Sequence, residues 1–109
     1  MGVGSKFIVP QSSKVEIGRD CDIAPEVMFE CGSHVVGPSS RRAGPGIANS
    51  ISIGDGVWIG ARALILGGAD IGRGCIVGAG AVVVPGHYAP DSLLAGVPAR
   101  IVKSFASDS

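Results

Sequence analysis

The chain has 109 residues, enough for one small domain, and its 18 Gly with only 5% aromatic residues favour a narrow aliphatic core over a layered globule. The formal net charge is zero, and the sequence contains no basic patch and no apolar run of about 20 residues, so we expect neither nucleic acid nor a membrane as a partner. The first residues lack the apolar region of a signal peptide, which predicts a cytoplasmic protein.

A repeat of six residues dominates the sequence. Residues 1–14 show no clear repeat and are expected to form a loose or partly ordered cap, with a short strand at residues 7–9. Between residues 15 and 88 a large apolar residue returns at every sixth position, with one break after Val35. The members are Ile17, Ile23, Phe29, Val35, Ile53, Ile59, Ile65, Ile71, Val77 and Val83. A small apolar residue follows four positions after several of them: Val57, Ala63, Ala69, Cys75 and Ala81.

Six is neither the period of a helix, near 3.6, nor that of a strand, near 2. It describes a short strand and a corner, repeated, and three such sides make a coil of about 18 residues. Stacked coils would pair as parallel strands roughly 4.8 Å apart, with the large apolar residues pointing inward as ladders. The pattern therefore predicts an all-β, single-stranded parallel β-helix.

The repeat breaks once, because its phase would put Arg41 on the axis of the aliphatic core, where an unpaired guanidinium is too costly. We expect about one hexapeptide within residues 39–46 to leave the coil as a loop, and Ile47 to resume the ladder. Residues 89–109 are expected to form a short C-terminal tail along the last coil or against a neighbour.

The hexapeptide pattern, with VWIGARALIL, GAGAVV and AGVPARIV, resembles the hexapeptide-repeat acyltransferases over about residues 15–103. The resemblance implies a left-handed β-helix, a homotrimer with active sites between subunits, and acetyl transfer from acetyl-CoA to a hydroxyl or amine of a small-molecule acceptor. The identity of the acceptor cannot be read from the sequence. A non-catalytic trimeric scaffold is an alternative. A metal hydratase needs three His ligands where this chain has only His34 and His87, so no metal is expected.

His34 is the candidate general base. With one hexapeptide looped out, His34 and Trp58 would lie 18 coil residues apart, at the same corner of adjacent coils. A solvated turn histidine is the alternative, but GSHVVGPSSRRAG resembles the segment that supplies the family's catalytic histidine. Neutral imidazole, with an ordinary pKa near 6.5, can take a proton at physiological pH. Glu26 and Glu30 are candidates to orient the ring, although solvated carboxylates are the simpler interpretation.

The resemblance also implies a donor site. Trp58 would form one wall, small residues would let the pantetheine arm lie against the coil, and cations would bind the phosphates. The residues concerned are Trp58, Gly60, Ala61, Gly78, Ala79, Arg100 and Lys103. Solenoid geometry alone would also explain the small residues. The family often has Thr-Lys-Asp where this chain has Val84, Pro85 and Gly86, so a hydroxyl contact at Val84 is in doubt.

The three cysteines have no metal-ligand spacing. Cys21 and Cys75 occupy the inward small position of their repeats, which indicates buried thiols. Cys31 is expected on an outward position near His34, where it could act as a nucleophile; direct transfer with His34 as base is favoured.

Overall fold

The computed structural model describes residues 1–105, which form short β-strands and no α-helix. Within these residues the strands make three mainly parallel sheets, which we call faces A, B and C, and a separate hairpin. Face A contains β1 (Lys6–Ile8), β4 (Met28–Glu30), β9 (Leu64–Leu66) and β12 (Val82–Val83). Face B contains β2 (Val15–Ile17), β7 (Ile51–Ile53), β10 (Ala69–Ile71) and β13 (Gly86–Tyr88). Face C contains β3 (Asp22–Ile23), β8 (Trp58–Ile59), β11 (Ile76–Val77), β14 (Ser92–Gly96) and β15 (Ala99–Ser104).

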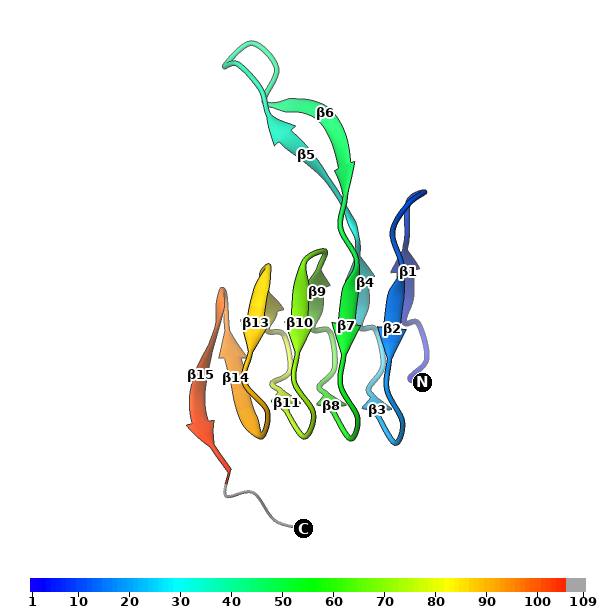
Figure 1. Ribbon diagram of the computed structural model, residues 1–109, viewed down its shortest axis with the longest axis vertical. Helices are drawn as coiled ribbons and strands as arrows, with labels where there is room; N and C mark the ends of the chain where they lie inside the picture. Colours follow the sequence, from blue (N-terminus) through cyan, green and yellow to red (C-terminus); the bar gives the residue numbers. More distant parts are fainter. Residues whose placement is uncertain (106–109) are drawn as a thin grey trace.

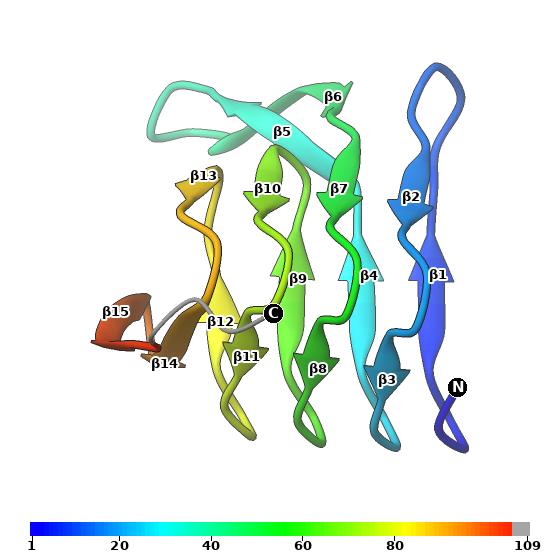
Figure 2. The ribbon, with the colours of Figure 1, turned by 60° about the horizontal axis from the view of Figure 1, so that its bottom comes forward.

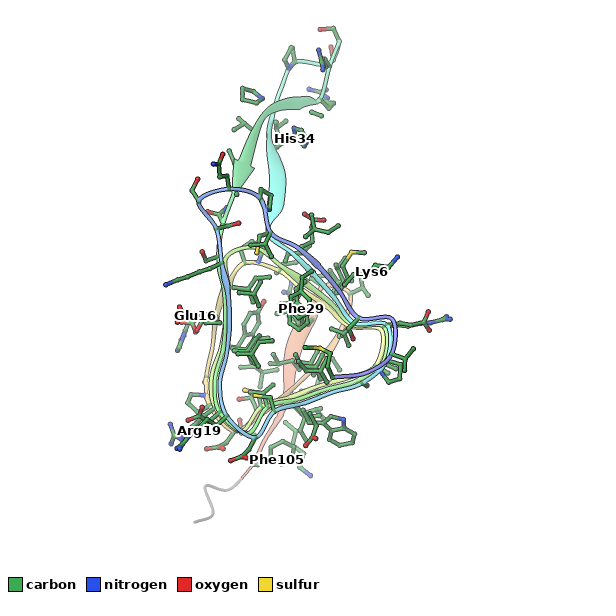
Figure 3. The ribbon with its side chains drawn as sticks, turned by 90° about the vertical axis from the view of Figure 1, so that its right-hand side faces the viewer. Lys6, Glu16, Arg19, Phe29, His34 and Phe105 are labelled. Carbon is green, nitrogen blue, oxygen red and sulfur yellow. The ribbon has the colours of Figure 1, made fainter. Side chains whose placement is uncertain are left out.

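The chain visits faces A, B and C in turn and then starts again, so that β1, β2 and β3 form one coil and β4, β7 and β8 the next. Figures 1 and 2 show the coils stacked side by side, and Figure 3 shows their three-sided outline. Because neighbouring coils pair as parallel strands, each coil satisfies the backbone hydrogen bonds of the next. The predicted coil architecture is therefore present.

The core consists of the predicted ladders. Phe29 pairs with Ile65 and Ile65 with Val83 on face A, and the other two faces carry equivalent columns. The six aliphatic residues from Ile53 to Val83 are at most 3% exposed. The small residues four positions on from the first five, from Val57 to Ala81, are equally buried. The inward register predicted for this block is confirmed, because each of these side chains points toward the axis of the three-sided coil and is buried there.

The N-terminal segment is part of the first coil rather than a loose cap. The predicted strand at residues 7–9 is observed as β1, which pairs with β4. The rings of Phe7 and Phe29 stack with centroids 4.7 Å apart and planes 5° from parallel. Because Phe7 covers one end of the face A ladder, Phe29 is fully buried.

The excursion is larger than the sequence predicted. Ile17 pairs with Ile53, 36 positions on, whereas Ile53 pairs with Ile71, 18 positions on, so a full coil's length of chain leaves the solenoid. It forms an antiparallel hairpin of β5 (Gly32–Val36) and β6 (Ala43–Ala48), which projects from the stack in Figure 1. Val35 and Ile47, which we expected in the ladder, lie in this hairpin and are 48% and 42% exposed.

The predicted C-terminal tail packs along the last coil. β15 turns back and pairs antiparallel with β14, and Leu94 and Ala99 are buried there. Residues 106–109, the end of that tail, lie outside the described residues. Between residues 1 and 105 there is no helix with the length and hydropathy needed to cross a bilayer.

Candidate active site

His34 lies on β5, in the exposed hairpin, and its ring is fixed by the facing strand (Figure 3). The Nδ1 atom lies 2.8 Å from the carbonyl oxygen of Gly44. A carbonyl oxygen only accepts hydrogen bonds, so Nδ1 must carry the proton in this contact. The neutral ring then presents the lone pair of Nε2, which is the form that a general base requires.

The hairpin approaches itself closely at Gly44. A Cβ atom built on Gly44 would lie 2.5 Å from the carbonyl oxygen of Val35, so only glycine fits without a backbone shift. At the tip, the Gly37 amide donates to the Arg42 carbonyl at 2.8 Å, and the Arg42 guanidinium donates to the Gly37 carbonyl at 3.2 Å. These contacts stabilise the hairpin, and the Gly44 carbonyl fixes the orientation of the His34 ring within it.

A cleft of about 620 Å³ opens beside His34, between the base of the hairpin and the loop that joins β1 to β2. Gln11 and Ser12 of that loop line one side, and Glu30, Ser33 and His34 line the other. The loop is a tight turn in which the amide of Ser13 donates to the Pro10 carbonyl at 3.2 Å, and Ser12 has a φ of 67°. The sequence analysis missed Gln11 and Ser12, because residues 1–14 carry no repeat from which their position could be inferred.

The two carboxylates proposed to orient the imidazole have other partners. Oε1 of Glu30 accepts a hydrogen bond from the Gly32 amide at 2.8 Å, and Oε1 of Glu26 lies 3.1 Å from Nε of Arg62. Neither carboxylate is hydrogen-bonded to His34 among residues 1–105. The Gly44 carbonyl orients the ring instead, and a backbone acceptor leaves no residue-type signal in a sequence.

The predicted meeting of His34 and Trp58 at one corner is wrong for a single subunit. Trp58 lies on β8 of face C, between Asp22 and Ile76, and its side chain is 55% exposed. The hairpin leaves the coil between β4 of face A and β7 of face B. The prediction assumed that one hexapeptide leaves the coil, and the longer hairpin carries His34 out of the coil altogether.

The predicted donor-site residues do lie together, on face C. Trp58, Ile76, Leu93 and Lys103 form one cross-strand row. The Gly60 amide donates to the Val77 carbonyl at 2.8 Å and the Gly78 amide to the Leu94 carbonyl at 2.7 Å, so a second row runs from Gly60 through Gly78 and Ala95 to Arg100. Arg100 and Lys103 are exposed at the ends of these rows, and Ala61 and Ala79 are exposed beside them.

The structure distinguishes solenoid geometry from a donor-binding role as the reason for the small residues of this row. A Cβ on Gly60 would lie 2.7 Å from the Ala79 amide nitrogen, so stacking of the coils requires glycine there. A Cβ on Gly78 would have no neighbour closer than 3.4 Å, which is ordinary contact. Solenoid geometry therefore explains Gly60 but does not account for Gly78.

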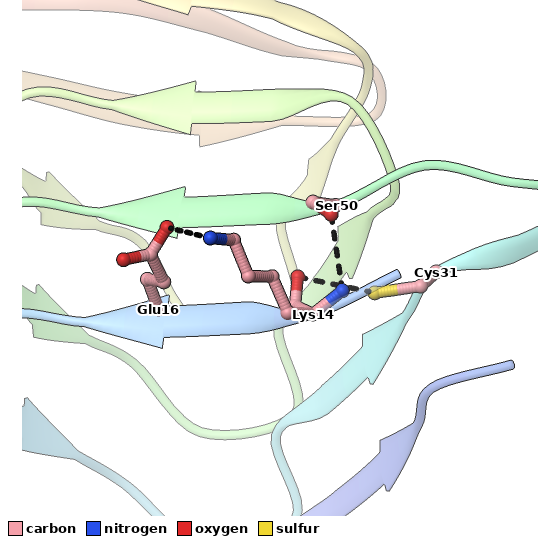
Figure 4. A network of polar contacts seen from close by, with 4 residues as sticks. All are labelled: Lys14, Glu16, Cys31 and Ser50. Carbon is pink, nitrogen blue, oxygen red and sulfur yellow. Dashed lines mark hydrogen bonds and ion pairs between the residues drawn. The ribbon is translucent and has the colours of Figure 1, made fainter. Parts of the chain in front are cut away.

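Cys31 is not at an outward position. It is only 1% exposed. Figure 4 shows its Sγ pointing to the carbonyl oxygen of Lys14, 4.0 Å away. The amide of Lys14 donates to Oγ of Ser50 at 3.0 Å. Burial raises the pKa of the Cys31 thiol, with a further increase from the Glu30 charge and an opposing effect of a hydrogen bond with Ser13. A buried thiol with a raised pKa is a poor nucleophile.

The remaining cysteines and histidine also have defined places. Cys75 is buried as predicted, whereas Cys21 is only partly buried. Nδ1 of His87 lies 3.0 Å from Oδ2 of Asp70 on the outer side of face B. Among residues 1–105, no group of three or more His, Cys, Asp or Glu side chains is arranged to hold a metal ion.

Comparison with known proteins identifies the repeat. Residues 50–85 match the family model described as bacterial transferase hexapeptide (six repeats), so the resemblance noted in the sequence is confirmed over this part of the chain. The chain is 36% identical over 91 residues to the galactoside O-acetyltransferase of Escherichia coli (strain K12), covering 84% of this chain and 44% of that protein.

Two solved structures extend the comparison. The maltose O-acetyltransferase of Clostridium difficile 630 superposes with a TM-score of 0.80 at 30% identity, covering 97% of this chain and 58% of that one. An acetyltransferase of Vibrio cholerae O1 biovar eltor, complexed with acetyl coenzyme A, has a TM-score of 0.69 at 25% identity, with coverage of 98% and 71%. The chain spans about half the length of the curated relatives that it matches.

Proposed function

We propose that this chain forms the hexapeptide-repeat part of an acetyl-CoA-dependent acetyltransferase that acts on a hydroxyl or amine of a small-molecule acceptor. The observation that carries the proposal is the bond from Nδ1 of His34 to the Gly44 carbonyl, which leaves Nε2 as a base at the edge of a cleft. The similarity to acetyltransferases, one of them complexed with acetyl coenzyme A, supplies the donor. A left-handed coil and a cytoplasmic location belong to the same proposal.

The reaction would be direct transfer. Nε2 of His34 takes the proton of the acceptor O–H or N–H as the oxygen or nitrogen attacks the thioester carbonyl carbon. A bond from that atom to the acetyl carbon forms and the carbon–sulfur bond breaks. The coenzyme A thiolate leaves and recovers the proton from the imidazolium. The Gly44 carbonyl stabilises the imidazolium form, because Nδ1 donates to it throughout.

The active site would be shared between subunits of a homotrimer. Within one subunit His34 projects between faces A and B, whereas Trp58 and the glycine row lie on face C. If the subunits pack side by side around a threefold axis, the hairpin of one can lie against face C of the next. His34 would then meet a donor bound by the neighbour's Trp58.

Face C has the features that an extended donor needs. The row with Gly60, Gly78 and Ala95 carries no large side chain, so the pantetheine arm can lie directly against the sheet. Ala61 and Ala79, which are also small, flank this row. Arg100 and Lys103 on β15 are exposed cations at the end of the rows, placed to pair with phosphates. Trp58 would pack against the arm from the other end.

The test is calorimetric titration with acetyl-CoA, followed by coenzyme A release against a panel of hydroxyl and amine acceptors. His34→Ala should lower turnover by about 10² to 10⁴ while acetyl-CoA affinity stays nearly constant, because the proton is taken only during attack. His87→Ala is the matched control and should retain activity. Absence of acetyl-CoA binding would contradict the proposal and favour the scaffold alternative.

A further inference from the structure

Glu30 is a half-buried carboxylate that has no cationic partner among residues 1–105. It ends β4, it is half-buried, and it lines the same cleft as His34. Its Oε1 accepts from the Gly32 amide, which fixes the carboxylate at the base of the hairpin. No Lys or Arg of residues 1–105 lies within ion-pair distance of it. A half-buried carboxylate without a cation is costly, and a cationic ligand would offset that cost.

The rest of the cleft does not neutralise this charge. The polar side chains that line it with Glu30 are the neutral groups of Gln11, Ser12 and Ser33, together with His34. The Lys14 ammonium lies outside the cleft lining and pairs with Glu16 at 3.3 Å. Arg41 lines a different hollow, between Pro38 and Pro45 near the hairpin tip. The cleft therefore presents a negative charge, hydrogen-bonding groups and a base.

We propose that the acceptor is a hydroxyl compound carrying a protonated amino group, and that Glu30 binds this ammonium while His34 deprotonates the hydroxyl. The inference rests on the proposed acetyl transfer. An ammonium nitrogen held by Glu30 has no lone pair and cannot attack the thioester, so the hydroxyl oxygen is the nucleophile. Its proton passes to Nε2 of His34, the carbon–oxygen bond forms, and the carbon–sulfur bond breaks. The product is an O-acetyl ester that keeps its amino group.

Glu30 is thus the residue that determines acceptor specificity. A charge-assisted hydrogen bond to a fixed carboxylate is stronger than one to a neutral amide. The same carboxylate repels an acceptor that carries its own negative charge. The structure therefore predicts a ranking in which amino compounds exceed neutral ones, and neutral ones exceed acids.

The test uses three acceptors that share one ring: glucosamine, glucose and glucuronate. Their kcat/KM values are measured by coenzyme A release, and their affinities by calorimetry without donor. The wild-type protein should prefer glucosamine over glucose by about tenfold or more. Glu30→Gln keeps a side-chain oxygen for the Gly32 amide but removes the charge, so it should abolish this preference with little change for glucose. Glu16→Gln, which removes an exposed carboxylate outside the cleft, should preserve the preference.

The outcomes separate the inference from the proposed function. Equal affinity and turnover for glucosamine and glucose in the wild-type protein would overturn the role of Glu30. An equal loss for both acceptors in Glu30→Gln, with a lower melting temperature, would show a purely structural role and overturn it as well. Glu30-dependent binding of glucosamine without turnover would support the ligand class and contradict acetyl transfer. Acetylation at the glucosamine nitrogen, seen by NMR of the product, would refute the assigned nucleophile.

Discussion

Nδ1 of His34 lies 2.8 Å from the carbonyl oxygen of Gly44, and both residues belong to a hairpin that stands outside the coil. One strand of the hairpin thus carries the imidazole and the other strand fixes its tautomer. The proposed base is therefore oriented by a backbone group rather than by a carboxylate. Its geometry depends on how closely the two strands approach each other.

Gly44→Ala should therefore impair catalysis without unfolding the solenoid. The new Cβ would lie 2.5 Å from the Val35 carbonyl oxygen, so the strands must separate and the contact with His34 must lengthen. We expect turnover to fall by about tenfold or more, with a shift in the ¹⁵N signals of the His34 ring. Gly46→Ala is the control, because its Cβ would meet the Ser33 carbonyl oxygen at 4.0 Å, an ordinary contact distance. Similar kcat values for the two variants would refute this account.

A site shared between subunits predicts complementation. His34→Ala and Trp58→Ala should each be nearly inactive alone. After equal amounts are unfolded and refolded together, about a quarter of the sites should combine an intact His34 with the neighbour's intact Trp58. Recovery of roughly that share of wild-type activity would support the arrangement. No recovery, or a stable monomer in sedimentation equilibrium at micromolar concentration, would exclude it.

The buried thiols should make stability depend on alkaline pH. Burial raises the pKa of Cys31 and Cys75 above the ordinary value of 9.0, so the folded state favours the neutral thiols. The stability that this contributes is fully present below the unfolded-state pKa and is lost as the pH rises through the folded-state pKa. The free energy of unfolding, measured with urea, should decline from about pH 9 upward, and less steeply in Cys31→Ala/Cys75→Ala. A parallel decline in both proteins would contradict the prediction.

Direct transfer predicts that no acyl group resides on a cysteine. Because Cys31 is buried and its pKa is raised, incubation with acetyl-CoA alone should leave the intact mass unchanged. Cys31→Ser should retain most of the activity. An acetyl adduct that disappears in Cys31→Ser would assign the nucleophile to this thiol, and ping-pong kinetics would accompany it.

The ladder register predicts a sharp contrast between two neighbouring substitutions. Ile71 is 1% exposed, so Ile71→Asp places an unpaired charge in the core and should cost more than about 4 kcal/mol, enough to unfold the protein. Arg73 is exposed two positions later, and Arg73→Asp should change stability by less than about 0.5 kcal/mol. Circular dichroism melting curves measure both. Equal losses of melting temperature would mean that the register is wrong.

Much of the fold could be predicted from the sequence because the inward positions repeat without exception between Ile53 and Val83. An aliphatic residue at every sixth position has one way to be buried in a three-sided coil, so local spacing determined which side chains form the core. The same regularity predicted that Trp58 points outward from the coil. It also placed Gly78 directly after an inward aliphatic residue, where the chain turns a corner. It also indicated that Arg41 must lie outside the core.

The size of the excursion was decided only by the tertiary structure. The hairpin removes 18 residues from the coil, and 18 is a multiple of six, so the repeat resumes in phase whether one hexapeptide or three are looped out. Val35 and Ile47 fit the apolar pattern and yet lie on the hairpin, and His34 moved with them away from Trp58. Cys31 is buried because the chain turns outward immediately after it. The orientation of His34 and the cleft with Glu30 depend on contacts to the Gly44 carbonyl and the Gly32 amide, and backbone groups are the same in every sequence.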